Sequence, residues 1–156
     1  YLQDLGMYSD TALRTCSWLY YAVEMRGLKP VPGIEQLLRY LKRTGVLLTV
    51  ISNAPKDQTI YRLAELGFTG YFDLVVTQET FGVKKPHPDV YLKTLARLGV
   101  KLTEAAMIGD KINRDVVPPR ELGIYGIHAA YGSMEKAYPV AVNTPEEILD
   151  LLRNPV

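Results

Sequence analysis

The polar residues best suited to chemistry lie at the end of an apolar run in the second half of the sequence. Ala105–Ile108 predicts a buried parallel strand that stops at Gly109 and delivers a carboxylate, Asp110. A second carboxylate, Asp115, follows five residues later. Because open α/β sheets bind ligands beyond the carboxyl ends of their strands, two acids here could hold a hard cation such as Mg²⁺. The competing interpretation is a strand-to-helix turn in which an aspartate caps the next helix.

Two further polar groups follow other predicted strands. Ser52 and Asn53 come directly after the apolar run Val46–Ile51, and Lys84–Pro86 lies in the loop after the strand predicted at 72–77. If these strands share one parallel sheet, all of these residues converge on the same edge. A hydroxyl, an ammonium group and a metal-binding acid suit phosphoryl transfer, because that reaction depends mainly on positioning and on electrostatic stabilisation of the phosphoryl oxygens.

Each residue also has a simpler explanation when it is taken alone. Ser52 could cap a helix or belong to a turn, Asn53 could tolerate a turn conformation, and Lys85 could be a solvated lysine. His87, between two prolines, is more typical of a surface residue than of a catalytic base. The ordered set at successive strand ends is much harder to produce by accident. Basic and imidazole side chains in the same loops would favour an anionic substrate: Lys56, His87, Lys111 and Arg114.

The elements that position these residues alternate between helix and strand from residue 33 onwards. Helices are predicted at 34–44, at 56–66, before Gly99, before Gly123 and, from a capping box at Thr144–Glu147, through about residue 152. Strands are predicted at 46–51, 72–77, 105–108 and 124–129, and residues 78–88 are predicted to form a loop. The proline pair at 118–119 is expected to delay the helix after Asp115 by a few residues. This pattern predicts an α/β fold with a doubly wound, Rossmann-like parallel sheet.

Composition narrows the class of protein. The length of 156 residues suggests one domain, and a net charge of +1 gives no reason to expect a nucleic acid or a membrane surface as the main partner. No apolar run approaches the roughly 20 residues that span a bilayer. Cys16 is the single cysteine, which favours a reducing cytoplasm. Because the sequence begins at Tyr1 rather than at methionine, we expect that residues upstream have been removed or left unrecorded.

The polar segments together resemble motifs of the haloacid dehalogenase superfamily, whose commonest members are Mg²⁺-dependent phosphatases. The resemblance covers about residues 31–153. Residues 48–53 are similar to the second motif of that family, whose serine holds a phosphoryl oxygen, which implies phosphate binding by Ser52 and Asn53. Residues 82–91 are similar to the third motif.

In that third motif, the lysine before the proline neutralises the nucleophile and the phosphate, which implies this role for Lys85 and not for Lys84. Residues 108–115 resemble the fourth motif. The resemblance there implies that Asp110 binds Mg²⁺ and that Asp115 supports the metal site.

The first motif of the family is an apolar strand followed by Asp-x-Asp, whose first aspartate becomes phosphorylated and whose second acts as general acid and base. No Asp-x-Asp occurs in these 156 residues. Residues 1–29, with a helix predicted at 9–26, resemble part of the helical cap that the family inserts between its first two motifs, which leaves 30–156 as the core. We therefore expect the nucleophile upstream of Tyr1. We also expect the strands at 46–52 and 105–110 to leave room for one more strand between them rather than to pair directly.

The leading hypothesis is a Mg²⁺-dependent phosphatase that acts on a small phosphorylated metabolite through an aspartyl phosphate. The alternative is a catalytically inactive relative that binds a phosphorylated ligand or a protein partner. A receiver-like signalling domain also uses acids, a hydroxyl and a Lys-Pro pair. In that domain the acidic pair comes before the hydroxyl and the lysine, which is the reverse of the order here. The sequence leaves the oligomeric state open.

Overall fold

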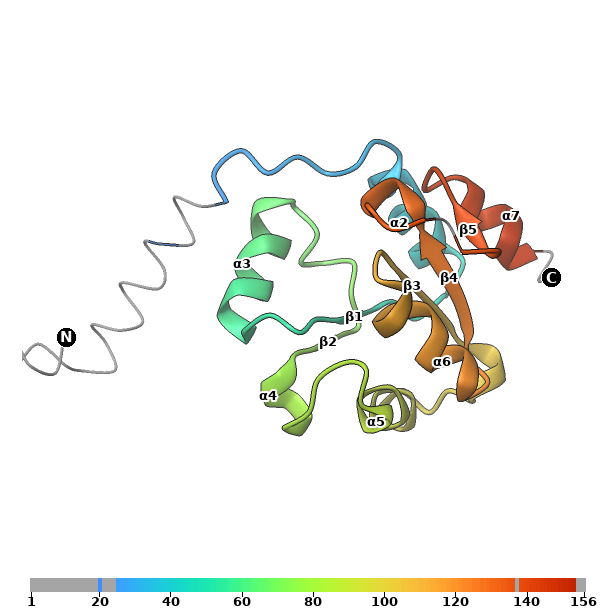
Figure 1. The fold of residues 1–156 in the computed structure, drawn as a ribbon. Coiled ribbons are helices and arrows are strands. Elements are labelled where there is room, and N and C mark those ends of the chain that lie inside the picture. The colour runs from blue at the N-terminus through green and yellow to red at the C-terminus, as the bar shows by residue number, and fades with distance from the viewer. Residues whose placement is uncertain (1–19, 21–24, 137, 154–156) are drawn as a thin grey trace, which may run out of the picture.

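The computed structural model describes residue 20, residues 25–136 and residues 138–153 (Figure 1). The helix predicted at 9–26 and the cap predicted at 1–29 therefore fall mostly outside the described residues. In chain order the elements are α2 (Ile34–Arg43), β1 (Thr49–Ile51), α3 (Lys56–Glu65), β2 (Leu74–Val76), α4 (Gln78–Phe81), α5 (Pro88–Leu98), the 3₁₀ turn η1 (Leu102–Glu104), β3 (Ala106–Gly109), the π-helical turn η2 (Ile112–Val116), α6 (Val117–Glu121), β4 (Tyr125–Ala129), the 3₁₀ turn η3 (Ala130–Gly132), β5 (Ala141–Val142) and α7 (Glu147–Arg153).

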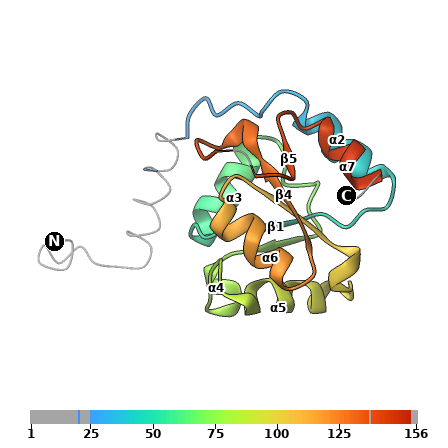
Figure 2. The ribbon, with the colours of Figure 1, turned by 45° about the vertical axis from the view of Figure 1, so that its right-hand side comes forward.

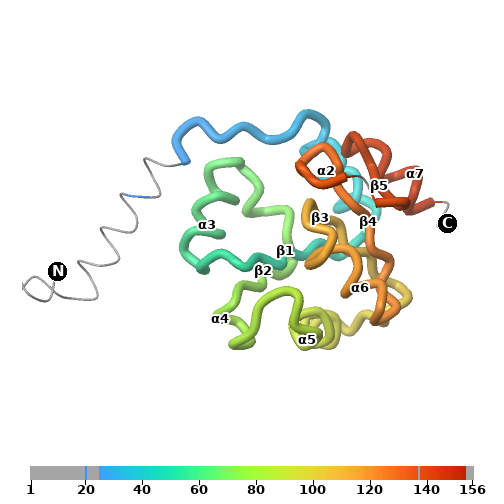
Figure 3. Tube along the Cα trace, in the orientation of Figure 1, coloured from blue at the N-terminus to red at the C-terminus, as the bar shows by residue number. Residues whose placement is uncertain are grey.

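Every strand pair in the described residues is parallel, as the alternation of strands and helices predicts. β1 pairs with β2, and a second sheet has the order β3-β4-β5. The trace in Figure 3 shows that the chain completes β1, α3, β2, α4 and α5 before it enters β3. β1 and β3 do not pair with each other in the described part of the chain, which agrees with the expectation that these two strands are not direct neighbours.

The two sheets nevertheless share the same two faces. The apolar side chains form two clusters. In β1, Val50 packs into the first cluster and Ile51 into the second. In β3, Ile108 packs into the first cluster and Met107 into the second. Since successive strand residues point to opposite faces, each cluster covers one face and runs across both sheets. The strands therefore form a single layer that is interrupted between β1 and β3.

Helices cover both faces of this interrupted layer. The first cluster takes buried residues from α2, α3, β4, β5 and α7, and the second takes Val90 and Tyr91 of α5. α2 and α7 lie side by side in both ribbon views (Figures 1 and 2). The Arg153 guanidinium of α7 donates a hydrogen bond of 3.1 Å to the hydroxyl of Tyr40 on α2. Helices on both faces of a parallel sheet confirm the doubly wound α/β fold.

Burial of the strands follows from how many neighbours each has. β4 lies between two strands, and Gly126–Ala129 are all buried. β1 has one neighbour, and all three of its residues are only half-buried. Val46 and Leu47, just before β1, are 42% and 49% exposed. In β3, Ala106 is exposed and the other three residues are half-buried.

The element boundaries differ from the predictions at three places. Residues 78–81 form the short helix α4 within the segment predicted as a loop. The prolines at 118–119 do not delay the helix, because they lie in the first turn of α6, where a missing N–H is tolerated. The Glu147 carboxylate accepts the backbone N–H of Asn143, one residue before the predicted cap at Thr144. No helix among the described residues has the length and apolarity to cross a membrane.

Candidate active site

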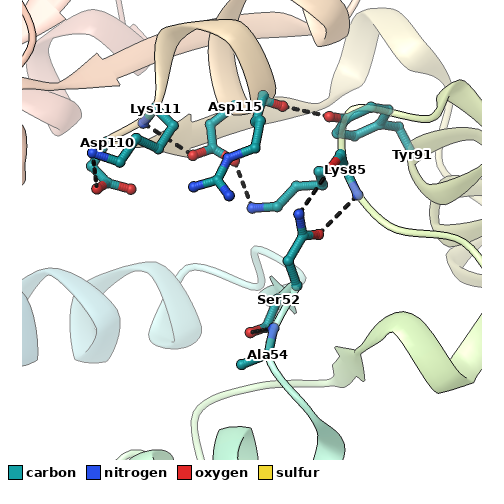
Figure 4. A network of polar contacts seen from close by, with 9 residues as sticks. Ser52, Ala54, Lys85, Tyr91, Asp110, Lys111 and Asp115 are labelled. Carbon is teal, nitrogen blue, oxygen red and sulfur yellow. Dashed lines mark hydrogen bonds and ion pairs between the residues drawn. The ribbon is translucent and has the colours of Figure 1, made fainter.

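Three chain segments that are distant in sequence meet at the carboxyl ends of β1 and β3 (Figure 4). Ser52 and Asn53 extend from β1, Lys85 comes from the loop between α4 and α5, and Asp110 and Asp115 follow β3. Hydrogen bonds join Asn53 to Lys85, and an ion pair joins Lys85 to Asp115. The structure thus brings together the residues that the sequence placed at three different strand ends.

A buried ion pair forms the centre of this arrangement. Lys85 Nζ lies 2.6 Å from Asp115 Oδ1, and the two side chains are only 11% and 3% exposed. The neighbouring Lys84 is exposed. An ammonium group has three donors, so the contact with Asp115 leaves Lys85 able to donate to a further anion.

The second oxygen of Asp115 and the lack of a side chain at Gly109 complete the surroundings of this carboxylate. Asp115 Oδ2 accepts the backbone N–H of Lys111 at 3.1 Å. A Cβ atom added at Gly109 would lie 2.3 Å from the Cβ of Asp115. Only glycine at 109 therefore allows the aspartate to pack against the end of β3. Both oxygens of Asp115 are engaged, so Asp115 acts within the protein as the partner of a lysine and of the η2 turn.

Asn53 and Ser52 link β1 to this centre. The Asn53 carboxamide donates to the backbone carbonyl of Lys85 and accepts the backbone N–H of the same residue, both at 2.8 Å. The hydroxyl oxygen of Ser52 accepts the backbone N–H of Ala54 at 3.1 Å, which is the turn role that the sequence allowed. This bond uses an oxygen lone pair, and the hydroxyl still carries a proton that it can donate.

Asp110 is the more accessible of the two aspartates that follow β3. Its side chain is 44% exposed, and Lys111 Nζ lies 3.6 Å from Asp110 Oδ2. Mg²⁺ in phosphoryl-transfer sites takes one or two carboxylates and completes its shell with water and phosphate oxygens. The described residues contain no cluster of three His, Cys, Asp or Glu side chains. The described carboxylates therefore fit only part of a Mg²⁺ site, which Asp110 could bind directly.

Two contributors to the site were not identified from the sequence. The hydroxyl of Tyr91 on α5 donates to the backbone carbonyl of Arg114 in η2. Burial, reinforced by the charge of Asp115, holds the pKa of this phenol far above its usual range, so Tyr91 remains a donor. The Glu135 carboxylate accepts the backbone N–H of Ile112 at 3.0 Å. Tyr91 lies in the helix predicted before Gly99, and a buried tyrosine hydroxyl usually has a partner. No local signal indicated Glu135.

Two of the basic and imidazole side chains predicted to favour an anionic substrate make contacts with neighbouring residues. Lys111 faces Asp110, as described above. His87 lies at the N-terminus of α5, where its Nδ1 accepts the backbone N–H of Asp89 at 3.2 Å. This capping contact agrees with a surface role rather than with that of a base.

Comparison with known proteins adds independent findings. The sequence profile described as haloacid dehalogenase-like hydrolase matches residues 5–128. The chain is 31% identical over 155 residues to glyceraldehyde 3-phosphate phosphatase of Methanocaldococcus jannaschii, which covers 96% of this chain and 68% of that protein. It is 33% identical over 129 residues to phosphoglycolate phosphatase of Aquifex aeolicus, which covers 81% of this chain and 60% of that protein.

A solved structure gives the same result. The crystal structure of a HAD phosphatase from Thermococcus onnurineus matches with a TM-score of 0.71 and 30% identity, over 78% of this chain and 57% of that chain. The chain spans about half to two thirds of the length of the first curated relatives that it matches, with shares of 68%, 61% and 47%.

The packing of Asp115 against residue 109 generates a prediction for stability. Gly109→Ala forces a Cβ atom into Asp115 and should lower the free energy of unfolding by about 1–3 kcal/mol, the usual range for overpacking. Urea denaturation measures this change. Gly70→Ala is the matched control, because an added Cβ there meets nothing within 4 Å. Equal midpoints for the two variants would show that the close packing of Asp115 against Gly109 is not a constraint.

Proposed function

The chain belongs to the haloacid dehalogenase-like hydrolase family, and on this premise we propose that it carries the phosphate site of a Mg²⁺-dependent phosphatase for small phosphate monoesters. The observation that carries the proposal is the convergence of Ser52, Lys85 and Asp110 around the buried Lys85–Asp115 pair. Two groups of curated relatives are named as phosphatases of glyceraldehyde 3-phosphate and of phosphoglycolate. These names favour a small, anionic, phosphorylated metabolite as substrate.

Each residue has a distinct role in this proposal. Lys85 provides a fixed positive charge for the phosphoryl oxygens, and Ser52 donates its hydroxyl proton to one of them. Asp110 supplies a carboxylate to Mg²⁺, and Asp115 keeps Lys85 and the η2 turn in place. Bound Mg²⁺ adds positive charge that stabilises the phosphoryl group. Because phosphoryl transfer needs mainly position and charge, these groups suit the binding half of the reaction.

The attacking group of an aspartyl-phosphate mechanism is not among these residues, because the sequence contains no Asp-x-Asp. Its aspartate oxygen would bond to phosphorus as the ester oxygen leaves, and water would then hydrolyse the acyl phosphate. The interruption of the sheet between β1 and β3 supports a location for this aspartate. A strand inserted there would cover the half-buried residues of both strands and end between Ser52 and Asp110.

A cytoplasmic location belongs to the same proposal, and the single cysteine supports it. The competing proposal of a non-catalytic module that binds a phosphorylated ligand is supported by the absence of Asp-x-Asp. The two proposals differ in one measurable property. Only the phosphatase releases inorganic phosphate with turnover.

The first functional prediction concerns the metal. In the full-length protein, Asp110→Asn should abolish Mg²⁺-dependent phosphate release, because it replaces the directly coordinating carboxylate by a neutral amide. The melting temperature should change little, since the Asp110 side chain is 44% exposed. Phosphate release from a panel of small phosphate monoesters, with Mg²⁺ and with EDTA, measures the effect. Normal turnover by this variant would refute the assignment of Asp110.

The second functional prediction concerns the adjacent lysines. Lys85→Ala should lower kcat at least about a hundredfold, because it removes a charge that acts mainly on the transition state. Lys84→Ala is the matched control and should change kcat little, since Lys84 is exposed. Steady-state kinetics of both variants, below their melting temperatures, decides the matter. Similar losses from both substitutions would contradict the distinct role of Lys85.

A further inference from the structure

The Asn53 side chain makes an unusual two-point contact with a single residue. Its Nδ2 donates to the Lys85 carbonyl and its Oδ1 accepts the Lys85 N–H, each at 2.8 Å. This arrangement satisfies both backbone groups of Lys85, as a neighbouring strand would. Lys85 lies in the loop between α4 and α5, so no regular ladder is available to fix it.

We propose that Asn53 is a positioning residue that acts through Lys85, and not a direct phosphate ligand. Its carboxamide oxygen and one amide proton are already committed to the Lys85 backbone. The contact fixes which of two consecutive lysines turns inward. The Lys85 side chain is 11% exposed beside Asp115, whereas Lys84 is exposed. The catalytic part of this inference rests on the proposed function, while the positioning part rests on geometry alone.

The position of Asn53 in the chain explains why this contact matters for the site. Asn53 follows Ser52 directly, so the contact joins the β1 end to the lysine loop. The Lys85–Asp115 pair then joins the lysine loop to the β3 end. Asn53 therefore sets the relative position of the hydroxyl and the ammonium group that face the same phosphate in the proposal.

The chemistry of the contact also specifies the residue type. Aspartate at 53 could still accept the Lys85 N–H, but it could not donate to the Lys85 carbonyl. Alanine would lose both bonds. Asn53→Ala should therefore release the Lys85 backbone fully, and Asn53→Asp should release it in part.

Competitive acetylation of the intact protein tests the positioning directly, without any need for activity. The probe is trace acetic anhydride, and mass spectrometry compares the modification rate of Lys85 with that of Lys84 in the same peptide. In the unsubstituted protein Lys85 should react more slowly than Lys84. Asn53→Ala should raise the Lys85-to-Lys84 ratio by about tenfold, the factor expected for the loss of one to two net hydrogen bonds.

The same measurement on other variants makes the test specific. Asn143→Ala, at an exposed asparagine outside the site, should leave the ratio unchanged. Asn53→Asp should give an intermediate ratio, and it provides the test if Asn53→Ala does not fold. An unchanged ratio in the folded Asn53 variants would overturn the proposal.

A double-mutant cycle on kcat in the full-length enzyme tests the consequence for catalysis. If Asn53 acts through Lys85, Asn53→Ala should lower kcat at least about tenfold on its own and should have little further effect in the Lys85→Ala background. If Asn53 binds phosphate itself, the two losses multiply and inhibition by inorganic phosphate weakens in both backgrounds. That second result overturns the proposal. Absence of turnover in every form would refute the proposed function, and acetylation would still decide the role of Asn53.

Discussion

The structure of the candidate site depends on the ion pair between Lys85 and Asp115. Two charges that are 11% and 3% exposed have lost most of their hydration, which is unfavourable unless each charge is closely paired and hydrogen-bonded. Here the 2.6 Å contact and the Lys111 N–H satisfy Asp115 on both oxygens. Several neighbouring features follow from this requirement, including the glycine at 109 and the tight η2 turn after β3.

The ion pair also explains how an interrupted sheet can support a defined site. β1 and β3 are not joined by backbone hydrogen bonds in the described residues, so the usual connection between neighbouring strand ends is lacking. Side chains bridge the interruption instead: Asn53 reaches from β1 to the lysine loop, and Lys85 reaches from that loop to Asp115. The two apolar clusters hold the same parts together from the faces of the layer.

Much of this fold could be predicted from sequence, because local signals specify it. The structure has α2 within the helix predicted at 34–44, with Leu37, Leu38 and Leu41 buried at helical spacing, and α5 ends at the predicted Gly99. Local signals did not reveal α4, which is one turn long and has no apolar period. Lys85 was distinguished from Lys84 by the resemblance of residues 82–91 to the third motif of the family. The partners of Asn53, Tyr91 and Glu135 lie 32, 23 and 23 residues away, and only the packed chain defines them.

A double-mutant cycle on stability tests most directly whether the Lys85–Asp115 pair holds the site together. Lys85→Met and Asp115→Asn should each lower the free energy of unfolding by roughly 3–5 kcal/mol, because each leaves the other group buried without its charged partner. Urea denaturation of the two single variants and the double variant should show a coupling energy of about 2–3 kcal/mol, at the upper end of the range for residues in contact. Additive losses within about 0.5 kcal/mol would contradict the account.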